Sequence, residues 1–330
     1  MSTNREQIVV GVIYNKRRNK VLVSRRPLTA HLGGLWEFPG GKMGEFEIAL
    51  TALKRELYEE LNMEVESARQ FIQIDHDYHD KKVKLDVWVV DTWRGEIYGK
   101  EGQALEWTWI NQLRKKQFPA ADSDLINAIT LSPLYLISPD LDVYNENFMN
   151  MTKNVIENGV RLFQFRSKKT SNDESHAISR KLLDICNENG CLFLYNGQPE
   201  EALELGAHGV HLNSRDLLKF SKRPMSDQYW VAASCHNEIE VKHAGNINLD
   251  FCVLSPVHET GSHGNTVTMG WDNFGVIAEQ STVPVYALGG MLPADLNMAF
   301  KHGAHGIAMI SGVYNARNPV DAVKKCLNDN

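Results

Sequence analysis

The second part of the chain is dominated by short apolar runs that alternate with helix-like stretches. Eight such runs occur between residues 134 and 310, each four to six residues long, the usual length of a buried strand. The stretches between them, such as His176–Asn187, Pro199–Leu205 and Pro293–Lys301, carry apolar side chains at helical spacing. This alternation predicts a closed (β/α)₈ barrel, with an open doubly wound sheet as the alternative. The runs are Leu134–Ile137, Arg161–Phe165, Leu192–Tyr195, Gly209–Leu212, Trp230–Ala233, Phe251–Leu254, Val283–Leu288 and Gly306–Ile310.

The first part of the chain has a different pattern. Apolar runs at Ile8–Tyr14 and Val21–Ser24 flank a polar turn, which indicates a β-hairpin. A helix is predicted from about Ile48 to Leu61, because leucines recur there on one face, and further strands are predicted at Val83–Val90 and Trp107–Ile110. We therefore expect an α/β domain over residues 1–130 and a barrel domain over residues 133–330.

Charge and composition exclude several classes of protein. Lys and Arg number 35 against 41 Asp and Glu, and this net charge of −6 argues against a nucleic-acid partner. No apolar run approaches the roughly 18 residues of a membrane span. The five cysteines form no Cys-x-x-Cys pair, which argues against a structural zinc site or a disulfide framework. We expect a soluble, cytoplasmic protein.

Three acidic residues on the predicted helix suggest a metal site. Glu56, Glu59 and Glu60 lie at positions i, i+3 and i+4, so they share one helix face and repel one another. A hard divalent cation such as Mg²⁺ would relieve that repulsion, because it prefers oxygen ligands and phosphate partners. The alternative is a solvated acidic face on which Arg55 pairs with Glu59.

The wider pattern around these residues resembles the Nudix box. It reads Gly41-x5-Glu47-x7-Arg55-Glu56-Leu57-x-Glu59-Glu60-x-x-Met63. The resemblance implies an α/β/α sandwich that binds Mg²⁺ or Mn²⁺ and hydrolyses nucleoside diphosphate derivatives. Asn62 stands where the family has glycine. Asn tolerates the left-handed conformation that ends a helix, so we expect the loop to keep its shape.

Within this family, residues 5–130 resemble the MutT-type 8-oxo-dGTP diphosphatases. The matching segments are Ser24-Arg25-Arg26, Ala30-His31, residues 36–42, residues 98–103 and Phe118-Pro119-Ala120. The resemblance implies that the nucleotide contacts Arg26, His31, Glu37, Phe38, Pro39 and Gly40. It also implies that the metal is held by the Gly40 carbonyl and by Glu56, Glu59, Glu60 and Glu101. Arg55 is implied to be a catalytic residue together with these glutamates.

The reaction implied by this resemblance releases a nucleoside monophosphate and pyrophosphate. Glu56 is the favoured general base and Glu101 its rival, and the sequence does not separate them. Asp122 replaces the asparagine that reads the base in the MutT type. Because a carboxyl group donates a hydrogen bond only when protonated, this exchange leaves purine selectivity less certain than catalysis.

The second part resembles the thiamine phosphate synthase and TenI family over residues 134–315. The matching segments are residues 135–138, 164–168, 206–212, 287–290 and 303–311. The resemblance implies a phosphate site at Gly289, Gly290 and Ser311, which would take a thiazole phosphate. It also implies that Gln164, Arg166 and Lys168 contact a pyrimidine diphosphate.

Other positions of the barrel depart from the family pattern. Asn196-Gly197-Gln198 replaces Asn-Asp-Arg, so Asp216 alone remains of two magnesium-binding carboxylates. The loop at residues 259–263 lacks the family's lysine. Because charge stabilisation is lost, we predict weak or absent synthase activity. A TenI-like thiazole tautomerase, with His258 or His263 as acid and base, is an alternative.

Three hypotheses about function follow. In the first, a Mg²⁺-dependent hydrolase removes oxidised purine nucleotides and the barrel has reduced or altered activity. In the second, the hydrolase acts on damaged thiamine-related diphosphates. In the third, the barrel is a non-catalytic module that binds a phosphorylated thiazole.

Overall fold

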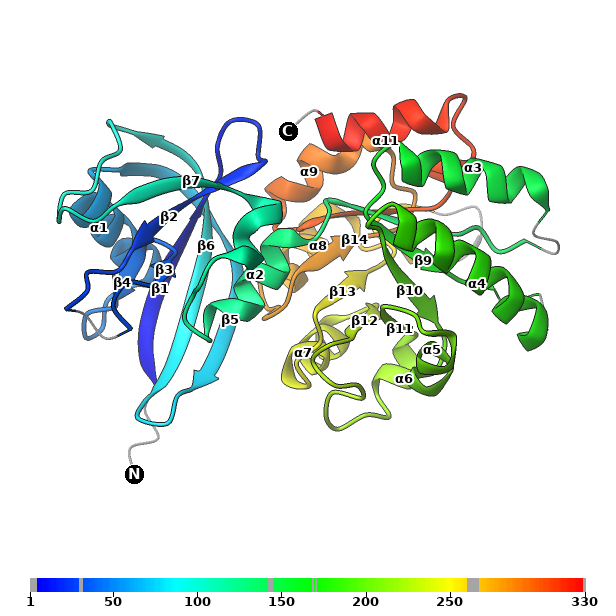
Figure 1. Cartoon of the computed structure of the whole chain (residues 1–330), viewed down its shortest axis with the longest axis horizontal. Helices are drawn as coiled ribbons and strands as arrows, with labels where there is room; N and C mark the ends of the chain where they lie inside the picture. Colours follow the sequence, from blue (N-terminus) through cyan, green and yellow to red (C-terminus); the bar gives the residue numbers. More distant parts are fainter. Residues whose placement is uncertain are drawn as a thin grey trace. The chain divides into compact units, whose positions relative to one another are not determined.

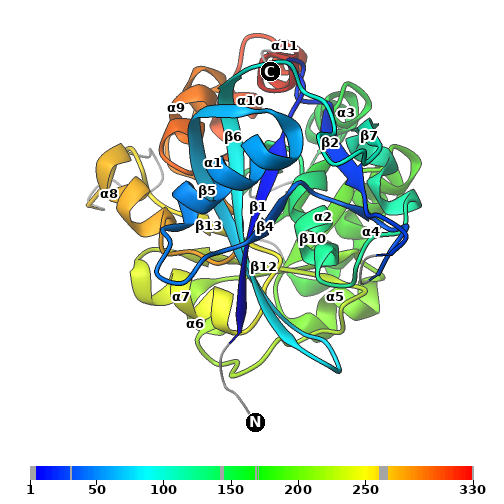
Figure 2. The same ribbon diagram turned by 90° about the vertical axis from the view of Figure 1, so that its left-hand side faces the viewer.

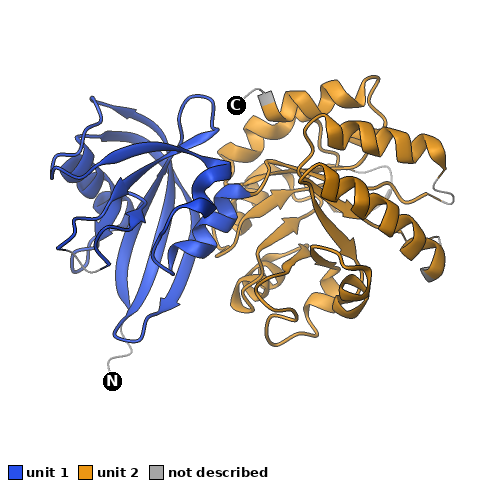
Figure 3. Cartoon of the chain, viewed as in Figure 1, with its two compact units in different colours: residues 1–130, 330 blue, residues 131–329 orange. Residues whose placement is uncertain are grey.

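The computed structural model describes residues 5–29, 32–141, 145–167, 169, 171–259 and 267–328. It divides into two compact units, residues 1–130 and residues 131–329 (Figure 3). In the described chain, no helix has both the length and the apolar character needed to cross a membrane.

The first unit contains two small sheets. Strands of the larger sheet run in the order β4-β1-β6-β5, and those of the smaller in the order β3-β2-β7. The larger sheet comprises β1 (Glu6–Ile13), β4 (Gly40–Lys42), β5 (Glu64–Asp77) and β6 (Lys82–Arg94). The smaller sheet comprises β2 (Lys20–Arg25), β3 (Trp36–Glu37) and β7 (Leu105–Trp109).

The predicted hairpin between the first two strands forms only at its turn, and the strands themselves do not pair. Strand β1 pairs with β4 and, in parallel over eight residues, with β6, while β2 pairs with β3 and β7. The two runs meet at an antiparallel bridge between Tyr14 and Val21, and the backbone N–H of Asn15 donates to the Lys20 carbonyl at 3.0 Å. Alternate residues of β1 face two separate cores, Val9 towards one and Val10 towards the other. A strand buried on both faces takes partners that are distant in sequence, which a local turn signal does not reveal.

Helix α1 (Ala49–Leu61) carries the acidic residues and crosses one face of the larger sheet (Figure 2). Leu53, Leu57 and Leu61 are fully buried and belong to the same core as Val9. The helix ends at Asn62, whose φ of 58° and ψ of 31° are left-handed, as predicted. The backbone N–H of Asn62 donates to the Tyr58 carbonyl at 3.1 Å. The 3₁₀ helix η1 (Ile110–Lys115) and helix α2 (Asp122–Thr130) complete the unit.

The second unit is the predicted eight-stranded barrel (Figure 1). All eight strands are parallel and close in the order β8-β9-β10-β11-β12-β13-β14-β15, which excludes the open sheet. The strands are β8 (Leu134–Ile137), β9 (Leu162–Phe165), β10 (Leu192–Asn196), β11 (Gly209–Leu212), β12 (Trp230–Cys235), β13 (Phe251–Leu254), β14 (Val285–Ala287) and β15 (Gly306–Met309). The helices are α3 (Glu146–Glu157), α4 (Asn172–Glu188), α5 (Pro199–Leu205), α6 (Ser214–Leu217), α7 (Glu238–Asn246), α8 (Gly270–Ala278), η2 (Pro293–Asp295), α9 (Leu296–Lys301), α10 (Ser311–Tyr314) and α11 (Pro319–Asn328).

The interior of the barrel is filled by aromatic side chains and a small polar layer. The rings of Tyr135, Phe251 and Tyr286 pack with centroids 5.3–5.7 Å apart. His211 joins Tyr135 to Ser234, with its Nδ1 3.1 Å from the Tyr135 hydroxyl and its Nε2 2.9 Å from Ser234 Oγ. Burial, assisted by the charge of Arg166, lowers the pKa of His211 to about 3. The imidazole is therefore neutral at physiological pH and serves as a hydrogen-bonding bridge.

Candidate functional site

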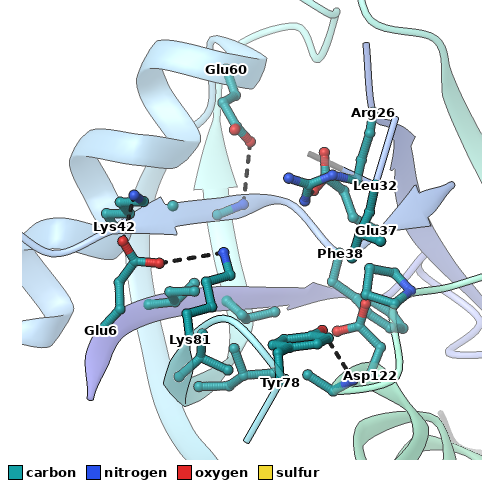
Figure 4. Close-up of a pocket in the computed structure, with 18 residues that line it drawn as sticks. Glu6, Arg26, Leu32, Glu37, Phe38, Lys42, Glu60, Tyr78, Lys81 and Asp122 are labelled. Atoms are coloured by element: carbon teal, nitrogen blue, oxygen red, sulfur yellow. Dashed lines mark hydrogen bonds and ion pairs between the residues drawn. The ribbon is translucent and has the colours of Figure 1, made fainter. Parts of the chain in front are cut away.

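A cavity of about 240 Å³ lies in the first unit and is lined by residues of both sheets and of the loops beside them (Figure 4). Six of the residues predicted for the nucleotide and metal sites line it: Arg26, Glu37, Phe38, Gly40, Glu60 and Asp122. The predicted ligand His31 lies outside the described residues. Pro39 is buried next to the cavity, and its carbonyl accepts a hydrogen bond from Gly11 N–H at 2.8 Å.

Two parallel strands give the cavity an apolar side. Ile8 and Val10 of β1 and Val83 and Leu85 of β6 line it, and Ile8 lies opposite Leu85 in the sheet. Phe38 closes another side and is stacked on the ring of a second phenylalanine, with 5.4 Å between centroids. A flat apolar surface of this kind suits the face of an aromatic ring.

Glu60 brings a carboxylate to the rim of the cavity. Its Oε2 accepts a hydrogen bond from Gly40 N–H at 3.2 Å. Burial raises the pKa of Glu60 to about 8 against the effect of that hydrogen bond, and the negative charges of Glu37, Glu56 and Glu101 add to the rise. Four carboxyl groups thus act on one another at this rim, where their mutual repulsion opposes ionisation.

Arg55 organises the remaining acidic side chains of α1. Its guanidinium donates to Glu47 at 2.8 and 3.0 Å, to Glu56 at 2.8 Å and to Glu59 at 3.2 Å. These hydrogen bonds lower the pKa of Glu47 to about 2 and raise that of Arg55. The pairing of Arg55 with Glu59, proposed as the alternative to a metal site, is therefore present, but it leaves Glu60 outside the network.

The donor set at this rim fits a hard divalent cation. Among the described residues, no three His, Cys, Asp or Glu side chains already converge on one point, since Glu56 and Glu59 are turned towards Arg55. Burial, with the charges of Glu37, Glu56 and Glu101, raises the pKa of Glu60, and no positively charged side chain of the described residues opposes that rise. Carboxylate and carbonyl oxygens are the ligands that Mg²⁺ and Mn²⁺ prefer, so the chemistry of these residues suits such an ion.

Arg26 and Asp122 occupy the side of the cavity away from α1. The guanidinium of Arg26 forms an ion pair with Glu37. Asp122 is 7% exposed, and burial together with the charge of Glu37 raises its pKa to about 7, although the charge of Arg26 opposes this. The carboxyl group is thus partly protonated near neutral pH and can then donate a hydrogen bond as well as accept one.

Several lining residues were missed by sequence reasoning. Glu6 forms ion pairs with Lys42 and Lys81, the latter at 3.6 Å, and all three line the cavity. Tyr78 also lines it, and its hydroxyl accepts a hydrogen bond from Ala121 N–H at 3.3 Å. These residues reach the cavity because β1 pairs with β6, and the sequence carries no local signal for that pairing.

Glu101 lies in the loop before β7 and is exposed. With Arg25, Arg26 and Pro27 it lines a second, more open cavity of about 310 Å³. The backbone N–H of Glu101 donates to Gln103 Oε1 at 3.0 Å, and Gln103 in turn donates to the Glu60 carbonyl at 3.0 Å. This chain of hydrogen bonds ties the loop to the end of α1.

The described residues among those predicted for the barrel ligand lie near or after the carboxyl ends of the strands. Gln164 is buried within β9, and Arg166 is the first residue after that strand. The side-chain amide of Asn196 donates to the His211 carbonyl at 2.9 Å. The ring of His258 packs edge-on against a tryptophan, with centroids 5.6 Å apart. Lys168 and His263 lie outside the described residues.

The glycine pair after β14 is shaped by close packing. Gly289 and Gly290 have φ values of 110° and 65°, and a Cβ on Gly289 would lie 2.9 Å from the backbone of Pro256. Ser311 is exposed at the start of α10. Asp216 is buried, and hydrogen bonding from Lys219 lowers the pKa of its carboxyl group.

Gly40→Ala is expected to destabilise the first unit by about 2–3 kcal/mol. Gly40 has a φ of 147°, and a Cβ there would overlap the carbonyl oxygen of Val9, so β4 would have to separate from β1. The matched control is Gly102→Ala, where φ is 78° and no atom lies within 4 Å of the added Cβ. That change should lower the free energy of unfolding by only about 1 kcal/mol. If a denaturant titration gave equal losses of unfolding free energy for the two variants, the steric explanation would be contradicted.

Comparisons with known proteins divide the chain into two parts that correspond to the two compact units of the fold. Residues 9–128 match the NUDIX domain model, and residues 134–313 match the thiamine monophosphate synthase model. The 8-oxo-dGTP diphosphatase of Escherichia coli (strain K12) is 37% identical over 120 residues, covering 36% of this chain and 92% of that protein. A thiamine-phosphate synthase of Clostridium perfringens (strain SM101 / Type A) is 29% identical over 196 residues, covering 59% of this chain and 94% of that protein.

Among solved structures, thiamine phosphate pyrophosphorylase from Pyrococcus furiosus matches with a TM-score of 0.49 at 24% identity, covering 58% of this chain and 92% of that one. The family models and the curated relatives agree with the motifs and with both folds. The chain therefore belongs to the Nudix family through residues 9–128 and to the thiamine monophosphate synthase family through residues 134–313.

Proposed function

We propose that the first unit hydrolyses 8-oxo-dGTP, or a closely related oxidised purine nucleoside triphosphate, to the monophosphate and pyrophosphate. The Nudix match supports a hydrolase that acts on phosphoric anhydrides, and the named relative from Escherichia coli supports the choice of substrate. The observation that carries the proposal is the carboxylate of Glu60 at the rim of a cavity that also has a flat apolar side and a buried Asp122.

Nudix hydrolases generally use divalent metals, and the residues here suit Mg²⁺ or Mn²⁺. When bound, the ion supplies charge neutralisation along the phosphate chain and a more acidic water. We assign its ligands to the Gly40 carbonyl and to the carboxylates of Glu56, Glu59, Glu60 and Glu101.

The chain's own residues supply the remaining functions in this proposal. Glu56 takes the proton of the attacking water, with Glu101 as the rival base. Arg55 positions the acidic side chains, because it holds Glu56 and Glu59 on one guanidinium. Arg26 lines the cavity and is ion-paired with Glu37, and in this proposal its guanidinium also contacts a phosphate of the substrate.

A substrate panel tests the proposal and separates it from the thiamine-related alternative. In the presence of Mg²⁺, we expect kcat/KM for 8-oxo-dGTP to exceed that for dGTP by at least about tenfold, since the preference requires differential hydrogen bonding in a buried site. Pyrophosphate or phosphate release from 8-oxo-dGTP, dGTP and thiamine diphosphate would be measured side by side. Equal turnover of the two purine nucleotides would refute a role in removing oxidised nucleotides. Faster hydrolysis of thiamine diphosphate would favour the hypothesis that the hydrolase acts on damaged thiamine-related diphosphates.

For the barrel we infer weak or absent thiamine phosphate synthase activity. The second carboxylate of the family's magnesium site is replaced by Gly197, and Asp216 is already hydrogen bonded to Lys219 at 2.5 Å. An assay with thiazole phosphate, the pyrimidine diphosphate and Mg²⁺ should form no thiamine phosphate above background. Product formation at a rate typical of a dedicated synthase would contradict this inference.

A further inference from the structure

Tyr78 brings a hydroxyl group to the cavity of the first unit, beside Asp122 (Figure 4). The residue directly follows β5, and its backbone N–H donates to the Lys81 carbonyl at 2.8 Å, which closes the turn to β6. Its ring packs edge-on against His76, with 4.5 Å between centroids. Its hydroxyl oxygen accepts a hydrogen bond from the backbone N–H of Ala121 at 3.3 Å. These contacts hold the hydroxyl group at one place on the cavity wall.

The proton of this hydroxyl group is available to a ligand. A tyrosine hydroxyl can accept one hydrogen bond while it donates another, and here the N–H of Ala121 takes the accepting side. Among the described residues, no atom accepts the hydroxyl proton of Tyr78. Burial raises the pKa of Tyr78 and the charge of Asp122 adds to the rise, although the hydrogen bond from Ala121 opposes both. The hydroxyl group therefore stays protonated at neutral pH and remains a donor.

Asp122 supplies an acceptor next to this donor. It directly follows Ala121 at the start of α2, so one short segment positions both groups. Its side chain is buried at the cavity, and in the part of the chain that the structure describes neither of its carboxyl oxygens accepts a hydrogen bond. A carboxyl group accepts a hydrogen bond in either protonation state, whereas it donates one only when protonated. Buried polar groups without partners are unfavourable, and a ligand that pairs with both groups would remove that penalty.

A donor beside an acceptor matches a particular feature of purine bases. Where a ring carbonyl stands next to a ring N–H, the base presents an acceptor and a donor side by side, which we call a lactam edge. Guanine has such an edge at C6 and N1, and a purine oxidised at C8 has one at C8 and N7. Adenine instead presents an amino group beside a ring nitrogen, so each of its polar groups would meet a group of its own kind. The apolar wall of β1 and β6 suits the flat face of either base, and selection therefore falls to the polar pair.

We propose that Tyr78 determines the base specificity of this unit: its hydroxyl group donates to the carbonyl oxygen of a lactam edge, and Asp122 accepts from the adjacent ring N–H. The proposal rests on the proposed function, because it takes the cavity as the place of the substrate's base. It adds a donor to the base site that does not depend on the protonation of Asp122. A purine without a lactam edge would leave both groups unpaired, and a site that hydrogen-bonds its substrate in this way discriminates strongly against such an analogue.

Calorimetry with four nucleoside monophosphates tests this proposal on the full chain. Of these, dAMP has no lactam edge, dGMP has the C6 edge, 8-oxo-dAMP has the C8 edge and 8-oxo-dGMP has both. Mg²⁺ is omitted, so that binding is measured apart from hydrolysis. We expect 8-oxo-dGMP to bind at least about tenfold more tightly than dAMP. Tight binding of dGMP would assign the carbonyl to C6, and tight binding of 8-oxo-dAMP would assign it to C8.

Tyr78→Phe should weaken binding of 8-oxo-dGMP about five- to tenfold and leave that of dAMP within about twofold, because phenylalanine keeps the ring and loses only the donor. The matched control is Tyr58→Phe, which removes a hydroxyl group from an exposed tyrosine of α1 and should bind all four nucleotides as the natural chain does. Equal weakening of dAMP and 8-oxo-dGMP by Tyr78→Phe would assign the hydroxyl group a structural role and overturn the proposal. Unchanged binding in Tyr78→Phe, or a natural chain that does not distinguish dAMP from 8-oxo-dGMP, would overturn it as well.

These outcomes can be told apart from failure of the proposed hydrolysis. If Tyr78→Phe selectively weakens binding of 8-oxo-dGMP but the natural chain does not hydrolyse 8-oxo-dGTP, the base site stands and the proposed reaction fails. If the natural chain hydrolyses 8-oxo-dGTP and Tyr78→Phe binds 8-oxo-dGMP as tightly as the natural chain does, the reaction stands and the role of Tyr78 fails. If none of the four nucleotides binds, the cavity is not a base site and the inference is overturned whatever the turnover.

Discussion

Glu60→Gln is expected to lower turnover of the nucleotide at least ~100-fold while leaving the fold intact. Glutamine keeps the shape of the side chain and an oxygen for the Gly40 N–H, so the contact at 3.2 Å can persist. It removes the negative charge that a divalent cation would need. Because burial raises the pKa of Glu60 to about 8, the neutral side chain should also be tolerated without loss of stability.

Turnover as a function of Mg²⁺ concentration and thermal unfolding would be measured together. Glu64→Gln is the matched control, since Glu64 is exposed at the start of β5 and its loss should change neither quantity. Near-normal turnover of Glu60→Gln at moderate Mg²⁺ would remove the metal assignment. A large fall in its melting temperature would instead assign Glu60 a structural role.

Asp122→Asn is expected to stabilise the first unit at pH 8 and to have no such effect near pH 4. The pKa of Asp122 is raised to about 7 in the folded chain, against 3.8 for an ordinary aspartate. Native Asp122 therefore holds its proton where the unfolded chain has released it. The resulting loss of folding stability is absent below about pH 4 and grows as pH rises to 7. Above pH 7 it is constant, at up to roughly 4 kcal/mol. Asparagine carries no charge and avoids this loss.

The groups that face Asp122 define the control for this experiment. Glu37 raises its pKa, Arg26 lowers it, and Tyr78 lies beside it. Asp124→Asn, on the exposed face of the same helix turn, should change stability by much less at both pH values. Chemical denaturation at pH 4 and pH 8 measures the difference. Destabilisation by Asp122→Asn at pH 8 would contradict the raised pKa of the buried carboxyl group.

The same substitution has a consequence for substrate choice. If Asp122 donates a hydrogen bond to the base, the preference for 8-oxo-dGTP over dGTP should fall as pH rises through 7 in the natural chain. Asparagine donates at every pH, so Asp122→Asn should make the preference independent of pH between about 6 and 8.5. A preference that declines equally in both chains would place the titrating group elsewhere.

Local patterns predicted the barrel because its eight strands and their helices are each encoded within a few residues. The apolar runs coincide with the strands to within one or two residues, and Asn62 ends its helix in the predicted left-handed conformation. The acidic face of α1 was likewise evident from the spacing of Glu56, Glu59 and Glu60.

The pairing of strands in the first unit could not be predicted in this way. The turn between Ile8–Tyr14 and Val21–Ser24 indicates a hairpin, yet β1 pairs in parallel with β6. That pairing brings Lys81 to Glu6 and gives the cavity its apolar side. Contacts between strands distant in sequence depend on how whole faces are buried, which no local window contains.

By itself, the sequence determined the two families, the strand and helix order of the barrel and the acidic helix, because periodicity and motif spacing are properties of neighbouring residues. Only the tertiary structure decided which charges are buried and what balances them. It left Glu60 without a cation among the described side chains, raised the pKa of Asp122 by burial, and supplied Asp216 with the ammonium group of Lys219. Ionisation depends on solvent exposure and on charges brought together by folding. The ionisation states that the proposed chemistry requires are therefore decided by the tertiary structure.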